Sequence, residues 1–402
     1  MPLQAKTVEN HKKRGWNAWV ISNDWISLTA IPEIGGRIME YSLGNHSPLF
    51  INDDLTGKTV NPAEGLEWPN FGGYKVWPAP QQTWQWPPPP VLDHGPYQAE
   101  IEHHNEESVT LCLKSHKEKW GIPGILLERR ITMKHNSTKV QLRETLINNS
   151  DRELSLSIWD VTQLIVQHFD KKDHENFWIY FPINPKSRYG KSGIYATADT
   201  PSLKGEAAPG IYGVQYNPVE TKIFSDCREG WIGYVDHGLQ LAYTKTFPNY
   251  HGKPYPDKDA RVAVYTSENL PYMEMEVMGP ILQMSPDEEI SLSVDWGLAY
   301  VSPPILDVND IGIVSRHLAL SEDRLTGRYG VFYEGSLFLV FRDLRGVMIK
   351  KLSPQAVRPD KPVRINFPAQ VESDVRLIEV QLNGPDGHLL GVLDSLEILP
   401  QR

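Results

Sequence analysis

The sequence predicts an all-β protein, in which a large antiparallel β-sandwich is followed by a small C-terminal β-sandwich domain. Three observations lead to this prediction. Apolar residues recur with a period of two through most of the first 300 positions, which places one face of each strand on a core. Turn-forming clusters, such as residues 148–151 and 285–287, separate these runs. Many consecutive strands without alternating helices are typical of antiparallel sandwiches.

The first series of runs supplies the large sandwich. Strands are predicted, in chain order, at residues 25–30, 109–113, 125–135, 139–148, 153–164, 231–235, 239–246, 261–266, 272–278 and 290–296. A helical pattern occurs only at residues 307–320, where the apolar positions Val308, Ile311, Val314 and Leu318 follow a period of 3.6. This segment is therefore expected to be a connector that is helical.

Strand-like runs resume after the connector. They occupy residues 330–341, 347–352, 363–367, 375–382 and 389–393. One hydrophobic core rarely serves more than about 250–300 residues, so a chain of 402 residues is expected to divide. The predicted divisions are a large sandwich at 1–303, a connector at 304–325 and an accessory domain at 326–402.

Composition narrows the classes of function. The net charge of -10 is spread along the chain without a Lys/Arg block, which argues against nucleic acid as a partner. No apolar run is long enough for a membrane span or a signal peptide, so a cytoplasmic protein is expected. The two cysteines, Cys112 and Cys227, lack metal-site spacing, and no phosphate loop or dinucleotide fingerprint occurs. Neither a metal nor a cofactor is therefore expected.

Residues 68–90 hold four of the twelve tryptophans, namely Trp68, Trp77, Trp84 and Trp86, among many prolines. Because proline fixes the backbone and lacks an amide donor, the segment is predicted to be a stiff extended loop rather than a strand in a sheet. Indole faces beside amides and a cation suit a sugar, which offers both apolar C–H patches and hydroxyls. The alternative is that these tryptophans pack the loop onto the sandwich.

Two strands place polar side chains on shared faces. Asp160 and Thr162 continue an apolar stripe, so either the strand end enters a cleft or Asp160 caps a turn. Glu274 and Glu276 share a face with side-chain origins about 7 Å apart, and mutual repulsion in a cleft would raise one pKa. The alternative is a solvent-facing stripe, with the methionines on the opposite face forming the core.

Two residues outside these strands are further candidates. His94 follows the aromatic segment directly, and its alternative role is that of a polar turn residue. Asp257 lies in a polar turn that is expected at the rim of a cleft.

Four segments in the same order resemble the galactose mutarotase-like superfamily, in a branch of mostly bacterial proteins. They are residues 30–38 (AIPEIGGRI), 70–81 (NFGGYKVWPAPQ), 159–163 (WDVTQ) and 274–280 (EMEVMGP). The resemblance covers roughly residues 15–300 and implies a supersandwich that holds a sugar. In the aldose 1-epimerases a glutamate takes the proton of the anomeric hydroxyl and a histidine protonates the ring oxygen. This chain has Asn70-Phe-Gly-Gly where those enzymes carry His-Gly-Gly.

Three hypotheses of function follow. The first is an enzyme acting at the anomeric centre of a sugar, with Glu274 or Glu276 as the base and Lys75, His94 or Asp160 as the acid. The residues expected to bind the sugar are Arg37, Asn70, Trp77, Gln81, Trp84, Thr162, Gln163 and Asp257. The second is a non-catalytic sugar-binding protein, and the third is a glycoside hydrolase or polysaccharide lyase on the same architecture. The partner is thus a small or oligomeric sugar, and the C-terminal domain is expected to stabilise the main domain or to mediate homo-oligomer formation.

Overall fold

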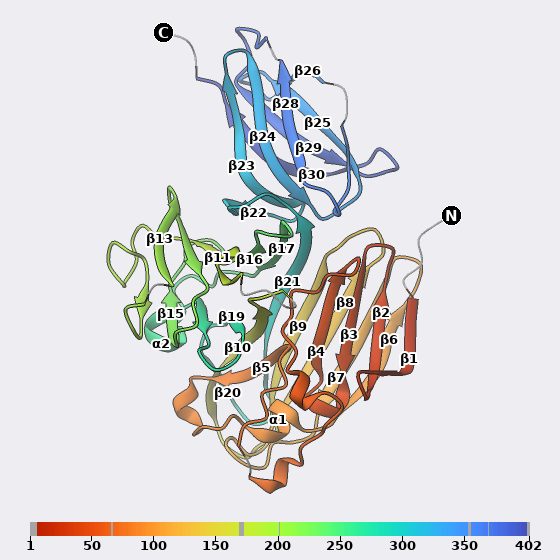
Figure 1. Ribbon diagram of the computed structural model, residues 1–402, viewed down its shortest axis with the longest axis vertical. Helices are drawn as coiled ribbons and strands as arrows, with labels where there is room; N and C mark the ends of the chain where they lie inside the picture. Colours follow the sequence, from red (N-terminus) through yellow and green to blue (C-terminus); the bar gives the residue numbers. More distant parts are fainter. Residues whose placement is uncertain are drawn as a thin grey trace.

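The computed structural model describes residues 6–65, 67–168, 173–200, 202–352, 355–368 and 370–399, so the last residues of the predicted C-terminal domain lie outside it. Two large antiparallel sheets face each other in the main body (Figure 1), which confirms the predicted all-β sandwich. Among the described residues, none of the helices has the length and apolar content needed to cross a bilayer.

The first sheet has eleven strands, in the order β1-β2-β3-β4-β5-β10-β19-β18-β15-β12, with β20 paired to β10. Its strands are β1 (Lys6–Lys13), β2 (Trp16–Ser22), β3 (Ile26–Ile31), β4 (Arg37–Leu43), β5 (Tyr74–Ala79), β10 (Leu154–Ile165), β12 (Tyr195–Ala196), β15 (Thr221–Ser225), β18 (Val262–Thr266), β19 (Tyr272–Met278) and β20 (Leu282–Met284).

The second sheet has ten strands, in the order β13-β14-β11-β16-β17-β21-β9-β8-β7-β6. Its strands are β6 (Tyr97–His104), β7 (Ser108–Ser115), β8 (Ile125–Lys134), β9 (Val140–Asn148), β11 (Phe177–Pro182), β13 (Leu203–Ala208), β14 (Ile211–Gln215), β16 (Trp231–Asp236), β17 (Leu241–Thr246) and β21 (Glu289–Tyr300). Short helical turns lie in the loops: α1 (Pro90–His94), α2 (Pro256–Asp259), η1 (Pro32–Ile34), η2 (Asp53–Leu55), η3 (Pro62–Glu64), η4 (Gln81–Thr83) and η5 (His174–Asn176).

The core between the two sheets is apolar but contains a few buried polar pairs. Met273 and Met275 of β19 are fully buried there, but Glu274 and Glu276 on the other face of β19 are buried as well, so the solvent-facing glutamate stripe of the alternative is not observed. The hydroxyl of Tyr74 donates to Glu144 over 2.8 Å, which links β5 of the first sheet to β9 of the second. Such buried polar groups are tolerated because they are hydrogen-bonded.

The C-terminal part contains two further sheets, drawn in teal to blue in Figure 1. One has four strands: β22 (Asp307–Val308), β23 (Gly312–Ser321), β24 (Arg324–Val331) and β28 (Val363–Pro368). The other has five: β25 (Gly335–Arg342), β26 (Met348–Lys351), β27 (Gln355–Val357), β29 (Leu377–Asn383) and β30 (Leu389–Glu397). These sheets enclose a core of their own, although the exact domain boundaries stay predictions.

The predicted helical connector is wrong, because residues 307–320 form β22 and most of β23. Val314 and Leu318 are both buried, and their spacing of four residues fits one face of a strand as well as one face of a helix. Hydrogen bonding to β24 decides in favour of the strand. The predicted single strand at 330–341 is likewise divided between β24 and β25.

The prediction of a loop throughout residues 68–90 is also wrong, because residues 74–79 form β5 in the middle of the first sheet. Pro78 lies opposite Ile158 of β10, within the paired part of the strand. On its other side, β5 pairs with β4 only at Tyr74, so Pro78 has no neighbouring strand there that needs an amide donor. Proline is therefore tolerated at this position.

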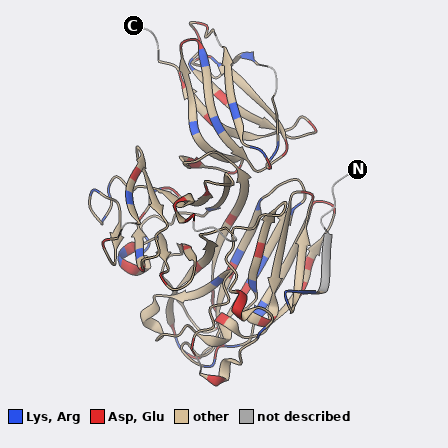
Figure 2. Ribbon diagram, in the orientation of Figure 1, with Lys and Arg blue, Asp and Glu red and all other residues tan. Residues whose placement is uncertain are grey.

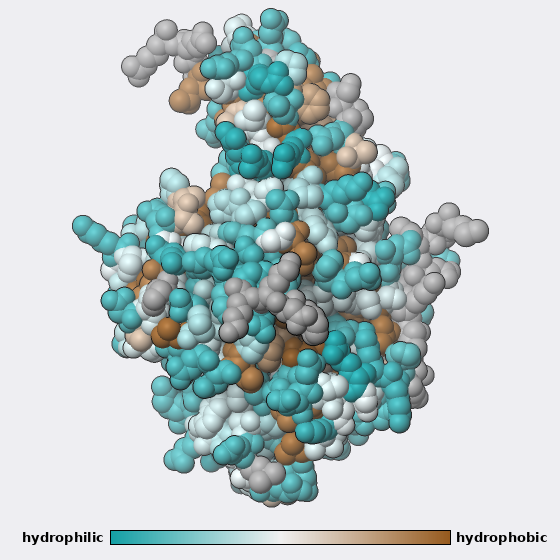
Figure 3. All heavy atoms as spheres, in the orientation of Figure 1, coloured by the Kyte–Doolittle hydropathy of each residue, from teal (hydrophilic) through white to brown (hydrophobic). Residues whose placement is uncertain are grey.

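Charge and hydropathy show no dominant patch on the face that is drawn. Residues of both signs are spread over the main body and the C-terminal part (Figure 2). The visible surface is mostly hydrophilic, with small separate hydrophobic areas (Figure 3).

Candidate functional site

Six side chains meet on the outer face of the first sheet, the face turned away from the second sheet. They come from β5, β10, β15 and β19, which are neighbours or near neighbours in that sheet. In the register, Lys75 and Glu276 both lie opposite Val161, and Glu274 lies opposite Gln163. We call these residues the Glu274–Glu276 cluster: Lys75, Trp159, Gln163, Lys222, Glu274 and Glu276.

Glu274 is held by two donors. Its Oε1 accepts hydrogen bonds from Nζ of Lys75 over 3.1 Å and from Nε2 of Gln163 over 2.9 Å. Burial lowers the pKa of Lys75, although the charge of Glu274 opposes that effect. The ammonium group also lies 5.5 Å from the ring centre of Trp68 and 5.1 Å from that of Trp77. Lys75 is thus a buried cation whose proton is easier to release than that of an exposed lysine.

Glu276 is completely buried and has different partners. Its Oε2 accepts from the indole of Trp159 over 2.7 Å and lies 3.0 Å from Nζ of Lys222. The Lys222 ammonium group lies 4.1 Å from the centre of the Trp159 ring. Burial raises the pKa of Glu276 to about 7, the charge of Lys222 opposes the rise, and Glu274 adds to it. The pKa is raised as the sequence hypothesis expects, but burial contributes more than mutual repulsion.

Three buried oxygen atoms near this face have no hydrogen-bond partner within the described part of the chain. They are Oε1 of Glu276, Oε1 of Gln163 and Oδ1 of Asn70. Asn70 lies beside Tyr272, at the start of the strand that carries both glutamates. Buried acceptors without donors are costly, so a ligand that brings hydroxyl groups would offset that cost.

Asp93 organises the aromatic residues beside the cluster. It lies 2.8 Å from the Arg37 guanidinium and accepts hydrogen bonds from the indole N–H groups of Trp77 over 2.7 Å and Trp68 over 3.0 Å. Burial by itself would raise the pKa of Asp93, but Arg37 and hydrogen bonds hold it well below its usual range. His94 also contacts this carboxylate, at 3.3 Å. Arg37 and His94 are therefore bound to Asp93 and do not contact Glu274 or Glu276.

Asp160 and Thr162 lie on the other face of β10, in the core between the sheets. Asp160 pairs with Lys245 of β17, and both side chains are fully buried. Neither alternative for Asp160 is observed, because it lies in mid-strand and faces neither a cleft nor a turn. The structure therefore separates both residues from the Glu274–Glu276 cluster.

The remaining predicted residues occupy the surroundings of the cluster. Trp77 and Trp84 are buried against each other, with 3% and 4% of their surfaces exposed, whereas Trp86 is 54% exposed. Gln81 is exposed in η4. Asp257 is half-buried, and burial raises its pKa while the charge of Lys222 opposes the rise. Asp257 thus lies at the edge of the cluster, next to Lys222.

Segment 83–90 also lines a cavity of about 500 Å³, together with residues 62–65 and 120–121. Its lining includes Trp84 and Trp120 but none of the residues of the Glu274–Glu276 cluster. The aromatic segment therefore faces two places: Trp68 and Trp77 border the cluster beside Lys75, whereas Trp84 and the later prolines line this separate cavity.

Sequence reasoning did not assign Trp159, Lys222 or Asp93 to the site. Trp159 could have been found, because it shares a strand face with Gln163. Lys222 and Asp93 lie far from the glutamates in the sequence. Lys222 comes near them only because β15 pairs with β18, which in turn pairs with β19, and Asp93 is in the short helix α1.

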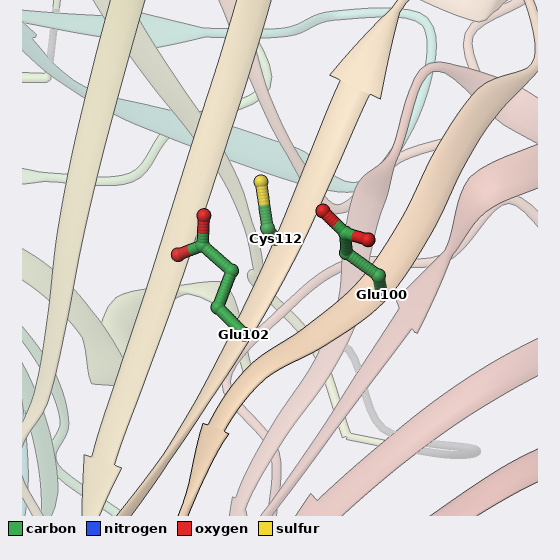
Figure 4. A group of neighbouring side chains, drawn as sticks. All are labelled: Glu100, Glu102 and Cys112. Carbon is green, nitrogen blue, oxygen red and sulfur yellow. The ribbon is translucent and has the colours of Figure 1, made fainter.

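One group of side chains elsewhere has the composition of a metal site. Figure 4 shows Glu100, Glu102 and Cys112 on neighbouring strands of the second sheet. Glu102 is already paired with Arg130 over 2.8 Å, and burial raises the pKa of the Cys112 thiol to about 12. A protonated thiol and a neutralised carboxylate are poor metal ligands.

Comparison with solved structures finds the same architecture elsewhere. A candidate aldose 1-epimerase from Klebsiella pneumoniae matches with a TM-score of 0.50 and 12% identity, over 73% of this chain and 83% of that one. A TPR-domain-containing protein from Parabacteroides distasonis matches with a TM-score of 0.50 and 14% identity, over 74% of this chain and 49% of that one, so this chain spans about half of its length. A candidate mutarotase from Salmonella typhimurium matches at 12% identity with a TM-score of 0.49, over 74% and 97% of the two chains.

No protein-family model matches the chain, and no curated protein matches it. At these identities the structural matches show the fold alone, and they confirm the fold that the resemblance implies.

Proposed function

We propose that this protein, a β-sandwich of the galactose mutarotase-like fold, binds a sugar on the outer face of its first sheet and acts at the anomeric centre through Glu276. One observation carries the proposal. Glu276 is completely buried, its pKa is raised to about 7, and one of its oxygens has no hydrogen-bond partner among the residues that the structure describes. A carboxylate in that state is suited to take and return a proton near neutral pH.

The surrounding groups support sugar as the ligand. The free acceptors of Gln163 and Asn70 would take hydrogen bonds from sugar hydroxyls, and the nearby indoles offer apolar faces. In the proposed reaction Glu276 removes the proton of the anomeric hydroxyl while Lys75 gives a proton to the ring oxygen. The ring carbon–oxygen bond then breaks, the aldehyde rotates, and the reverse proton transfers close the ring as the other anomer.

Anomer exchange measured by NMR or polarimetry with a panel of aldoses tests this proposal. We expect Glu276→Gln to lower the exchange rate by at least about 100-fold, since that is the scale of general acid–base catalysis. Glu289→Gln is the matched control, because Glu289 is exposed at the start of β21. Spontaneous exchange that the wild-type protein does not accelerate for any aldose would refute the catalytic proposal.

A second candidate is a sugar-binding protein without catalysis. It is favoured by the absence of any hydrogen bond or ion pair between a histidine and Glu274 or Glu276 across the described ranges. Titration calorimetry separates the two candidates. Sugar binding without anomer exchange, weakened by Trp159→Ala, would favour this second function.

A further inference from the structure

A second charged cavity lies beside α2, on the edge of the main body. Its volume is about 470 Å³, and its lining residues are Arg188, Gly252, Lys253, Pro254, Tyr255, Lys258, Asp259 and Arg261. Four of these side chains are cationic and one is anionic, so the lining carries a formal charge of +3 in a chain whose net charge is -10. A cavity of this sign attracts anions against the field of the whole molecule.

The single carboxylate of the lining is already engaged. Asp259 lies 3.3 Å from the Arg188 guanidinium and accepts the backbone amide of Tyr255 over 3.2 Å. Lys258 faces the ring of Tyr195 at 3.9 Å and has no carboxylate partner among the described residues. The side chain of Lys253 has no hydrogen bond or ion pair in that part of the chain either. Most of the positive charge of the cavity lining is therefore not neutralised by a carboxylate of the same lining.

Arg261 supplies a fixed donor. Its guanidinium lies 5.2 Å from the centre of the Tyr255 ring, and its Nη1 donates to the carbonyl of Cys227 over 3.0 Å. These contacts hold the group in place, yet its Nε is buried and has no partner in the described structure. A buried, oriented guanidinium proton without an acceptor is a strong reason to expect an oxygen ligand.

The backbone of α2 contributes to the shape of the cavity. Three consecutive residues that are not glycine, Asp257, Lys258 and Asp259, have left-handed φ angles of 49°, 64° and 81°. Each such residue costs on the order of 1 kcal/mol, and such strain is concentrated at functional sites. The same turn places Asp257 near Lys222 of the Glu274–Glu276 cluster and Lys258 on the cavity.

We propose that this cavity binds an oxyanion, such as a phosphate, sulfate or carboxylate group, through Lys253, Lys258 and Arg261. The anion is either a free inorganic ion or the charged group of a sugar derivative. The proposal does not depend on catalysis by Glu276, because none of the three cations contacts that residue.

Binding of inorganic phosphate and of sulfate to the full-length protein tests the proposal, at constant ionic strength set with chloride so that screening does not change. We expect saturable binding in calorimetry and a rise in Tm that follows ligand concentration. Lys253→Gln should weaken the affinity by about tenfold, through loss of a charge-assisted contact. Lys117→Gln is the control, because Lys117 is exposed and is not one of the residues that line the cavity.

Arg261→Gln serves only as a second variant, because Arg261 also holds the loop at Cys227. Lack of saturable binding by the wild-type protein would overturn the proposal, as would equal affinities of the Lys253→Gln and Lys117→Gln variants.

Competition with neutral aldoses and their phosphorylated and acidic derivatives identifies the source of the anion. Tighter binding of a charged sugar than of inorganic phosphate would support the sugar derivative, provided that the difference disappears in Lys253→Gln. Equal affinities for the charged sugar and for inorganic phosphate would support a free ion. Unchanged phosphate affinity in Glu276→Gln shows that the two sites are separate.

Discussion

At the scale of single residues, two glutamates on one strand face have acquired different environments. Glu274 keeps 7% of its surface exposed and accepts hydrogen bonds from Lys75 and Gln163. Glu276 is fully buried, and its pKa is raised to about 7. Paired titratable groups whose surroundings differ in this way are typical of acid–base sites.

The raised pKa of Glu276 makes stability depend on pH. The folded state binds this proton more tightly than the unfolded state, in which the pKa is 4.5. The contribution to stability is therefore fully present below about pH 4.5 and is lost as the pH rises through about 7. The Glu276→Gln variant stays neutral, so its stability relative to the wild type should rise by about 2–3 kcal/mol between pH 5 and pH 8.

Urea denaturation of both proteins at the two pH values measures this change. Glu289→Gln should show no such dependence, since Glu289 is exposed. A stability difference between Glu276→Gln and the wild type that does not vary with pH would contradict the raised pKa.

Asp93 is the residue whose loss should disturb the site most. Asp93→Asn leaves the buried Arg37 without its counter-charge, so we expect a loss of about 3 kcal/mol in the free energy of unfolding. Asp53→Asn is the control, because the exposed side chain of Asp53 pairs with Arg14 at 3.5 Å. This variant should lose less than about 0.5 kcal/mol in the free energy of unfolding. Equal losses in the two variants would show that Asp93 is not an organising residue.

At the scale of elements, β5 is the strand that brings the aromatic segment to the glutamates. It lies between β4 and β10 and places Lys75 and Trp77 on the outer face. The two glycines before it allow close approach of the backbone. A Cβ atom on Gly73 would lie 2.5 Å from the carbonyl oxygen of Ile38 in β4, and Gly73 has a φ of +66°.

Gly73→Ala should therefore displace the start of β5. We expect a loss of about 3 kcal/mol, because both the positive φ and the backbone contact oppose a side chain. Gly44→Ala is matched in conformation, with a φ of +60° and nothing within 4 Å, and should cost only about 1 kcal/mol. The measurement is thermal or urea unfolding, and similar losses in both variants would mean that close packing of β5 on β4 is not required.

At the scale of the whole molecule, a third apolar cluster joins the C-terminal sheets to the main body. The cluster contains Val308, Ile313 and Phe332 of the C-terminal part. They pack with Ala299, near the end of β21, and with Val301, which directly follows that strand. A shared apolar core makes the two parts unfold cooperatively, because neither can open without exposing it.

Phe332→Ala should uncouple the two parts. Phe332 is 1% exposed, and its ring lies against Gly297 of β21. We expect a loss of about 3–4 kcal/mol and separate transitions in calorimetry for the main body and the C-terminal part. Phe367→Ala is the control, because Phe367 packs on the C-terminal core and is not part of the cluster that joins the two parts, as far as the structure describes the chain. A single transition in Phe332→Ala with unchanged Tm would contradict a coupling role.

The sequence by itself determined the all-β class, the positions of about half of the strands, such as β7–β10 and β16–β19, and the shared face of Glu274 and Glu276, because a period of two is a local property of the chain. It could not determine that residues 74–79 form a central strand or that residues 307–320 form strands, since pairing partners decided both. Only the tertiary structure decided which face of each strand is outer. For that reason Asp160 lies in the core with Lys245, whereas Lys222, distant in sequence, lies beside Glu276. The pKa of Glu276 follows from the same cause, because burial is produced by the whole fold.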